Sequence, residues 1–366
     1  MTIFELLKNP IFDLPKYHNN RSYEMLFMDT MNEYCALLSE LEDFDIHQEH
    51  SRKIDANEIF NKALNLGKGI IRTLTESNNG RPYKAFDEFK TILDESDFVY
   101  KTEILMGGED LYRVRVSNNN YSFSKDEIFH IPFHLKNIIP TQRYSIPGFP
   151  CLYLSDSVYT CWEEMKRPDI NSLHASRFRN NKVSQVLLIP NPKEEIEMYA
   201  QEDKIVEGVI GIGIDSLLAN FPLYLACSVG VQNPKDPFKI EYIIPQLLLQ
   251  YVRQSNEVQG VKYFSTNIDY SNGNISGTFN NYVFPVKTLD TKGFCKGLEE
   301  AFTFTEPLSN GMIQNGGTTV LYQKGELDSI HVKKIELVKG RAIPYSDSPF
   351  AFMELNLSWS KTEKRN

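Results

Sequence analysis

Residues 142–165, QRYSIPGFPCLYLSDSVYTCWEEM, combine side chains that can bind an anion with side chains that can stabilise a cation. Arg143 precedes a Ser-Ile-Pro-Gly turn, where an exposed guanidinium can hold a phosphate through two parallel hydrogen bonds. Tyr153 lies in the short apolar run CLYLS, and two glutamates, Glu163 and Glu164, follow on a helical pattern. Each residue alone also has a purely structural explanation: a surface arginine, a core tyrosine and solvated helix glutamates.

Helical geometry separates the two glutamates. The polar Ser-Asp-Ser segment suits a helix start, and an apolar stripe follows it at i, i+3, i+4 and i+7. At about 100° per residue, Glu164 lies beside the edge of this stripe and Glu163 points towards the opposite side. The two carboxylates therefore cannot converge on one substrate as a glycosidase pair does, and Glu164 is the candidate for chemistry. The stripe consists of Val158, Cys161, Trp162 and Met165.

Helical patterns fill the first part of the chain. A second helix is predicted where Asp55 followed by Glu58 matches a capping box, and a third over residues 83–93, after the turn ESNNGRP. We therefore predict a small helical domain over residues 1–104, with no chemistry of its own. In the first helix, within residues 23–44, the apolar side chains at helical spacing are Met25, Met28, Met31, Cys35, Leu38 and Leu41.

Short runs rich in β-branched and aromatic residues dominate from about residue 105 onwards. The predicted strands are DLYRVRV, CLYLS, SQVLLIP, KYFST, NYVFPV, TTVLYQK and IHVKKIELV. Two helical patterns, SVYTCWEEM and EYIIPQLLLQYVRQ, are embedded among them. Strands with few helices predict an α+β domain over residues 105–366.

Composition excludes several classes of partner. The net charge of −9 argues against nucleic acid, because proteins that bind the phosphate backbone carry a basic face. The five cysteines are odd in number and lack CxxC spacing, which is typical of free thiols in a reducing compartment. The first residues do not predict a secretory signal, and polar breaks in residues 205–229 argue against a membrane span. We therefore predict a cytoplasmic protein that does not contact membranes.

The chemistry-bearing residues together resemble the RES domain, a family named for its Arg, Glu and Ser residues. The resemblance covers residues 111–286 and selects the same glutamate, Glu164, as the helical geometry does. It implies an ADP-ribosyltransferase-like mixed sheet and an NAD-consuming toxin of the bacterial toxin–antitoxin type. The matching residues are Arg113 in DLYRVRV, Arg143 in TQRYS, Tyr153 in PCLYLS, Glu164 in the helix that follows and Ser265 in GVKYFST.

The chain departs from the family pattern at several points. TQ stands where the family has a glycine pair, and the interval between the glutamate and the serine is longer than in compact members. The longer interval implies an insertion within residues 166–220. The N-terminal helical domain lies outside the family's core domain. Arg115 stays open as an alternative first arginine, although adjacency to Tyr112 favours Arg113.

The resemblance also implies roles for these residues in cleaving the bond between nicotinamide and ribose, a reaction that develops positive charge on the ribose. Glu164 would hold the ribose hydroxyls and stabilise that charge. Arg113 and Arg143 would hold the pyrophosphate through charge-assisted hydrogen bonds. Tyr153 and Ser265 would orient the nicotinamide and its ribose.

Several alternatives remain open within this scheme. Tyr144 and Thr266 are neighbours that could take over the orienting roles, and no metal is implied. Water as acceptor makes the protein an NAD glycohydrolase, phosphate makes it an NAD phosphorylase, and a protein side chain makes it an ADP-ribosyltransferase. We favour destruction of NAD itself. Because such a protein is toxic to its own cell, we expect a neutralising antitoxin partner, and the helical domain is open as a partner or homodimer surface.

Three rival readings carry less weight. His130 and His134 stand at i, i+4 as zinc ligands can, but the proline between them disfavours a helix and no further ligand completes a site. The sequence GVIGIGID at residues 208–215 has the order GxxGxG and lacks the GK[ST] of a phosphate-binding loop. Cys151 and Cys161 fall on apolar faces, which argues against a cysteine hydrolase. A RES-type fold that has lost its activity and serves as a binding module is the non-enzymatic alternative.

Overall fold

The computed structural model describes residues 1–46, 52–95, 102–117, 121–201, 213–315 and 332–357. It combines helices with a mixed sheet, which confirms the predicted class of fold. The chain forms two compact units. The first unit comprises Met1–Thr102, Gln142–Tyr144 and Leu187–Tyr251, and the second unit comprises Glu103–Thr141, Ser145–Val186 and Val252–Asn366.

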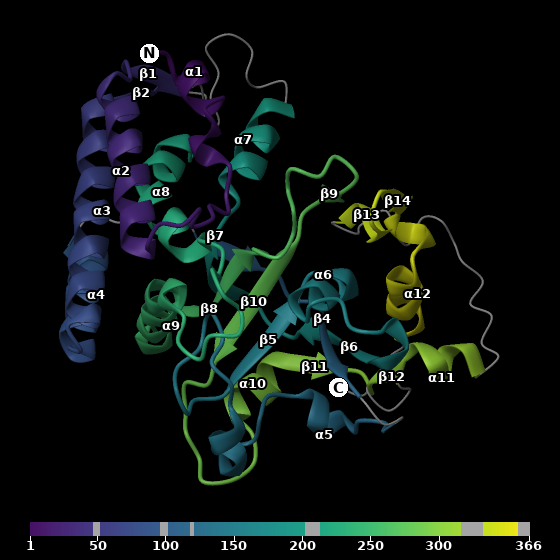
Figure 1. Ribbon diagram of the computed structural model, residues 1–366. Helices are drawn as coiled ribbons and strands as arrows, with labels where there is room; N and C mark the ends of the chain where they lie inside the picture. The colour runs from purple at the N-terminus through teal and green to yellow at the C-terminus, as the bar shows by residue number, and fades with distance from the viewer. Residues whose placement is uncertain (47–51, 96–101, 118–120, 202–212, 316–331, 358–366) are drawn as a thin grey trace. The chain divides into compact units, whose positions relative to one another are not determined.

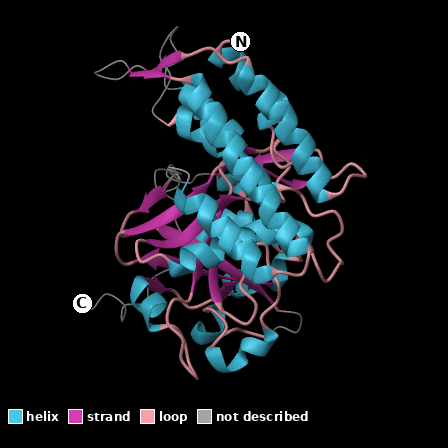
Figure 2. Cartoon of the chain, turned by 90° about the vertical axis from the view of Figure 1, so that its left-hand side faces the viewer, coloured by secondary structure: helices cyan, strands magenta, loops and turns pink. Residues whose placement is uncertain are grey.

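The first unit is built around α3, which packs against α2, α4 and α8. Figure 1 shows α2 and α3 side by side, and Figure 2 shows the long helices in cyan from a second direction. Side-chain caps begin α2 and α3: Ser22 accepts from the Met25 amide, and Asp55 accepts from the Asn57 amide. The elements of this unit are α1 (Ile3–Leu7), η1 (Pro10–Phe12), α2 (Tyr23–Ser39), β1 (Phe44–Ile46), β2 (Arg52–Ile54), α3 (Ala56–Asn78), α4 (Pro82–Glu95), α7 (Pro192–Gln201), α8 (Ile214–Ser228), η4 (Ile240–Tyr242) and α9 (Ile243–Gln254), which ends just past the unit boundary.

The buried face of α2 differs from the predicted stripe. Met25 and Met28, which share that helical spacing, are 56% and 44% exposed. Both sets of positions have helical spacing, and the face that turns inward carries the larger aromatic side chains. The buried side chains are Tyr23, Leu26, Phe27, Thr30, Met31, Tyr34 and Leu38.

Helix α8 explains why the first unit extends beyond the predicted boundary at residue 104. Its side chains are buried around most of its circumference, and two tyrosines of α2 donate to its backbone carbonyls. The Tyr23 hydroxyl lies 2.9 Å from the Ala226 carbonyl, and the Tyr34 hydroxyl lies 2.7 Å from the Leu218 carbonyl. Residues 187–251 therefore belong to the helical unit through tertiary packing, which local sequence patterns do not reveal.

The second unit contains a sheet with the strand order β11-β6-β4-β5-β10-β8-β7-β3, and β12 also pairs with β6. The unit boundary falls within β7. A smaller sheet has the order β14-β13-β9. The strands are β3 (Thr102–Leu105), β4 (Asp110–Val116), β5 (Cys151–Ser155), β6 (Leu173–Asn180), β7 (Ser184–Ile189), β8 (Val258–Phe264), β9 (Ser276–Gly277), β10 (Asn280–Pro285), β11 (Phe302–Phe304), β12 (Leu308–Ser309), β13 (Val332–Val338) and β14 (Arg341–Pro344).

Several sequence predictions map directly onto these strands. DLYRVRV and CLYLS are β4 and β5 with the predicted bounds. The insertion was predicted to lie within residues 166–220, and this range also contains β6, which pairs with β4 along its whole length and so belongs to the sheet itself. The predicted strand TTVLYQK and the first residues of GVIGIGID lie outside the described residues. The helical elements of this unit are α5 (Lys125–Ile128), η2 (Phe133–Ile138), α6 (Val158–Glu164), η3 (Ile170–Ser172), α10 (Lys296–Ala301), α11 (Asn310–Asn315), η6 (Tyr345–Asp347) and α12 (Pro349–Asn356).

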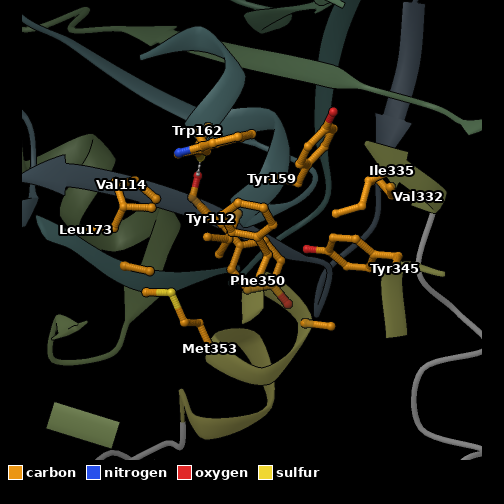
Figure 3. Packing of buried hydrophobic residues seen from close by; sticks show 14 of the residues in the cluster. Tyr112, Val114, Tyr159, Trp162, Leu173, Val332, Ile335, Tyr345, Phe350 and Met353 are labelled. Carbon is orange, nitrogen blue, oxygen red and sulfur yellow. Dashed lines mark hydrogen bonds between the residues drawn. The ribbon is translucent and has the colours of Figure 1, made fainter. Parts of the chain in front are cut away.

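A cluster of aromatic side chains fixes α6 against the sheet. Tyr112 of β4, Tyr159 and Trp162 of α6 and Phe350 of α12 are all buried in it, as Figure 3 shows. The rings of Trp162 and Phe350 are 5.1 Å apart, and the indole donates to the Pro168 carbonyl at 2.7 Å. These large rings supply much of the apolar burial here and hold the short helix in place.

Glu354 of α12 is buried at the start of α6, where its Oε1 accepts from the Val158 amide at 2.7 Å and from the Tyr345 hydroxyl. Burial raises the pKa of this carboxyl to about 7, and the Tyr345 hydroxyl, the Val158 amide and Arg177 only partly oppose the rise. The pKa in the folded state is thus above the unfolded value near 4.5. The corresponding stability is fully present below pH 4.5 and is lost as the pH rises towards 7.

We expect Glu354→Gln to remove this pH dependence, because the amide oxygen can still accept both hydrogen bonds without burying a charge. The variant should match the wild type near pH 4.5 and be more stable at pH 8 by at most about 3 kcal/mol. Urea unfolding followed by circular dichroism at the two pH values measures the difference. The prediction would be contradicted if the free energies of unfolding of the variant and the wild type differed by the same amount at both pH values.

None of the helices in the described part of the chain has the length and apolar composition needed to cross a bilayer.

Candidate functional site

Glu164, the last residue of α6, is held by three neighbours. Its Oε1 accepts from the Ser265 hydroxyl at 2.6 Å and from Nδ2 of Asn281 at 2.8 Å. Its Oε2 accepts from Nδ2 of Asn267 at 2.6 Å. The structure thus brings together the predicted glutamate and the predicted serine, which are 101 residues apart in the sequence.

The sheet places these partners beneath the end of α6. Ser265 follows β8, and its amide donates to the Phe279 carbonyl at 2.8 Å, which continues the pairing of β8 with β10. Asn281 lies on β10 between β8 and β5, and these three strands run side by side in Figure 1. Ser265 and Asn281 are buried, whereas Glu164 and Asn267 are half-buried. The carboxylate therefore rests on buried polar groups and keeps access to solvent.

The hydrogen bonds of Ser265 show that its side chain orients the Glu164 carboxylate. Its hydroxyl hydrogen is donated to Glu164, and its oxygen accepts from the Asn267 amide at 3.2 Å. The side chain is fully buried. In this geometry Ser265 orients the carboxylate, whereas the sequence predicted that it orients the nicotinamide and its ribose directly.

Glu163 does not point to solvent as the helical wheel predicted. Its side chain is only 4% exposed and makes a two-pronged ion pair with Arg167, at 2.7 and 2.8 Å. The Arg167 guanidinium in turn lies 5.2 Å from the Trp162 ring. The helix is covered by neighbouring elements on more than its apolar stripe, and the buried charge is tolerated because it is paired. Glu163 is therefore structural.

A left-handed turn follows Glu164 and ends the helix. Lys166 and Arg167 have φ values of 64° and 55°, a backbone conformation that non-glycine residues rarely adopt. The turn brings the Lys166 ammonium to Oδ1 of Asn267, to which it donates. A cation is thus fixed beside the carboxylate without pairing with it.

Arg113 lies on β4 where that strand separates from β5. Among the described residues, Tyr112 and Ser155 are the one registered pair between these strands, and beyond it the Arg113 guanidinium donates to the Tyr153 carbonyl at 2.9 Å. Its Nε is buried without a hydrogen-bond partner, and within the described ranges no carboxylate pairs with it. Burial lowers the pKa of Arg113 to about 10, with Arg115 as the second cause, so the group remains a cation at neutral pH. A half-buried cation with no carboxylate partner in the described part of the chain suits an anionic ligand.

Arg115, the alternative first arginine, has other partners. It donates to the Glu127 carbonyl and lies 4.4 Å from the Phe123 ring.

Tyr153 is half-buried, and burial raises the pKa of its hydroxyl well above the ordinary value, with the Cys151 thiol as the next cause. Tyr153 is therefore a protonated hydroxyl at any physiological pH.

Arg143 and Tyr144 belong to the first unit. Arg143 donates to the carbonyls of Cys227 and Val229 at 3.1 and 3.0 Å, at the end of α8, and lies 5.3 Å from the Tyr242 ring. Tyr144 is 1% exposed and lies beside the Cys227 thiol. The structure therefore gives both residues packing roles in the first unit, and their predicted roles in binding the pyrophosphate and the nicotinamide remain predictions.

The structure also shows the surroundings of the residues considered for a zinc site and for a cysteine hydrolase. His130 accepts from the Cys295 amide at Nε2, 2.9 Å away, and its Nδ1 lies 2.8 Å from the Ile131 carbonyl, so both ring nitrogens are engaged. In the described ranges no group of three or more His, Cys, Asp or Glu side chains is arranged to hold a metal. Burial raises the pKa of the Cys151 and Cys161 thiols to about 12, which makes them poor nucleophiles.

The sequence reasoning missed Asn267 and Asn281. A signal for Asn281 existed, because asparagine is disfavoured in strands and NNYVFP is otherwise an apolar strand. An asparagine at a buried strand position needs polar partners, and here those partners are Glu164 and Ser155. Asn267 lies in a loop after β8, where the residue type alone carries no such signal.

Comparison with known proteins finds one clear relative. The chain is 34% identical over 284 residues to a protein of Bacillus subtilis (strain 168) that bears the name "Putative toxin YopC". The similarity covers 72% of this chain and 62% of that protein, so the chain spans less than two thirds of its relative's length. No family model matches the chain, and no solved structure does.

Proposed function

We propose that this protein consumes NAD by cleaving the bond between nicotinamide and ribose, as a glycohydrolase or a phosphorylase, and that it acts as a toxin. The observation that carries the proposal is the half-buried Glu164 carboxylate, held in place by Ser265 and two asparagines. The RES-type resemblance pairs this glutamate with this serine, and their direct hydrogen bond supports the match.

The chemistry required is stabilisation of a developing cation. As the C–N bond breaks, nicotinamide leaves as a neutral molecule and positive charge grows on the ribose. A carboxylate fixed in advance stabilises that charge without reorganising during the reaction. Water then adds to the ribose carbon and releases a proton, which yields ADP-ribose, or phosphate adds and yields its phosphorylated form.

Arg113 is the proposed binding group for the pyrophosphate. Its guanidinium is a cation with a buried, unpartnered Nε and with no carboxylate partner in the described part of the chain. The half-buried guanidinium can donate charge-assisted hydrogen bonds to a phosphate from its exposed part. This contact would fix the anionic part of NAD and leave Glu164 to act on the ribose.

The toxin role and its setting rest on other observations. The similarity to a protein named as a toxin supports a toxic function. All five cysteines are unpaired, which supports action in a reducing compartment such as the cytoplasm, where NAD is available. A cell that makes such a protein needs a neutralising partner, and we propose an antitoxin protein that blocks the site.

Chromatography of NAD after incubation with the purified protein, with and without phosphate, tests the proposal. We expect one nicotinamide released for each NAD lost, and the co-product then identifies water or phosphate as the acceptor. Intact NAD under both conditions would overturn NAD destruction. Transfer of labelled ADP-ribose from NAD to proteins of a cell extract would then identify an ADP-ribosyltransferase, and its absence would favour an inactive binding module.

A further inference from the structure

Two asparagines hold the Glu164 carboxylate, and the family resemblance gives neither of them a role. We propose that Asn281 and Asn267 are positioning residues that leave Glu164 one open acceptor position, on Oε2, for a hydroxyl group of the substrate. This inference rests on the proposed function, because it names the substrate contact of the same site. It predicts a ligand that donates one hydrogen bond there, as a ribose hydroxyl does.

The orientation of Asn281 follows from its partners. The Ser155 hydroxyl donates to its Oδ1 at 2.7 Å, and its Nδ2 donates to Oε1 of Glu164 at 2.8 Å. An ionised carboxylate can only accept, so the reverse orientation of the amide would place two acceptors in contact. Ser155 and Asn281 are both buried, which prevents water from replacing either contact.

Asn267 is fixed in the same way from the other side. Its Oδ1 accepts from the Lys166 ammonium, which can only donate, and its Nδ2 donates to Oε2 of Glu164 at 2.6 Å. Its backbone amide donates to the Ser265 hydroxyl. One asparagine thus connects the carboxylate, the serine and the lysine of the turn.

Counting acceptor positions identifies the open one. A carboxylate offers about four lone-pair positions, two on each oxygen. Ser265 and Asn281 occupy both positions on Oε1, and Asn267 occupies one on Oε2. Since the partners of Oε1 are buried and Asn267 is half-buried, the remaining position on Oε2 lies at the accessible side of the carboxylate.

Neutral partners also preserve the charge of the carboxylate. Within the described ranges Glu164 has no ion pair, and the nearby Lys166 contacts the asparagine oxygen instead. An arginine or lysine in place of either asparagine would orient the carboxylate equally well but would offset its negative charge. Amide donors therefore fix Glu164 while leaving its charge to act on the ribose cation.

The test is Asn281→Asp, which keeps the shape of the side chain but replaces the donor with a second carboxylate. Two carboxylates in contact hold one proton at low pH and repel each other at high pH. We expect kcat for NAD cleavage to fall about 30-fold at pH 8, with KM little changed, and to recover substantially at pH 5.5, where the shared proton restores a hydrogen bond. The wild type should not show this recovery.

Asn272→Asp is the matched control. Asn272 donates to the Glu336 carboxylate elsewhere in the second unit, so the same substitution creates the same repulsion away from Glu164. We expect this variant to keep the wild-type pH profile of activity. If Asn281→Asp does not fold, Ser155→Ala removes only the hydroxyl that orients Asn281, and we expect kcat to fall about 5-fold.

A second measurement separates this inference from the proposed function. Carbon NMR of the labelled Glu164 carboxyl requires no NAD, and we expect its titration to move to higher pH in Asn281→Asp but not in Asn272→Asp. An unmoved titration, or a pH profile that both variants share, would overturn the positioning role. If the titration moves while the wild type leaves NAD intact, the positioning role stands and NAD cleavage fails.

Discussion

Glu164→Gln is expected to lower kcat for NAD cleavage by about 10³-fold or more, the largest effect of any single substitution in this protein. The substitution removes the negative charge that would stabilise the ribose cation and changes few atoms. KM for NAD should change much less, because Arg113, the proposed pyrophosphate contact, is untouched. Nicotinamide release under single-turnover conditions measures the effect on the chemical step directly.

Glu163→Gln provides the control on the same helix. Glu163 is the neighbouring carboxylate of α6, but it pairs with Arg167 and is 4% exposed, so its loss weakens packing without removing a substrate contact. We expect this variant to unfold at lower temperature and to keep kcat within about 3-fold of the wild type. Equal losses of activity in both variants would show that α6 merely tolerates no change, and the catalytic assignment of Glu164 would fail.

The sequence was sufficient to predict the strands that carry the site, because their signals are local. DLYRVRV has the β-branched and aromatic content that is typical of a strand, CLYLS is a short apolar run around a tyrosine, and they form β4 and β5. The helix after CLYLS was equally visible, since Ser157 caps it, and three members of its predicted stripe are buried while the fourth, Met165, lies past the helix end and is 39% exposed. Of the two glutamates on this helix, the helical geometry favoured Glu164, and the family resemblance selected the same residue.

The differences between expectation and structure concern helix faces whose burial depends on tertiary packing. Glu163 is buried because α6 is covered by neighbouring elements beyond its apolar stripe, a circumstance that a helical wheel does not include. On α2 two overlapping stripes have helical spacing, and contacts with α3 and α8 selected the one that includes Tyr34. Neither choice could be made without knowing which elements meet.

The polar residues that hydrogen-bond to Glu164 could not be predicted from local sequence, because they also depend on tertiary structure. Ser265 was selected only through the family resemblance, and its contact with Glu164 depends on the pairing of β8 with β10. Asn281 becomes meaningful only when β10 is placed between β5 and β8. Long-range strand pairing therefore determines which polar residues surround the carboxylate.

Arg113→Lys is expected to lower kcat/KM for NAD by about 10²-fold, mainly through a higher KM. Lysine keeps the positive charge but lacks the planar guanidinium that can bind a phosphate through two parallel hydrogen bonds. Two charge-assisted bonds reduced to one point contact correspond to about 3 kcal/mol. Steady-state nicotinamide release over a range of NAD concentrations separates KM from kcat.

Arg115→Lys is the matched variant, because it changes the other arginine of β4 in the same way. Arg115 already donates to the Glu127 carbonyl and stacks on Phe123, so its replacement should leave kcat/KM within about 3-fold of the wild type. The reverse result, a large loss from Arg115→Lys and a small one from Arg113→Lys, would make Arg115 the pyrophosphate contact. In that case the unpartnered Nε of Arg113, buried where β4 and β5 separate, would serve only the fold.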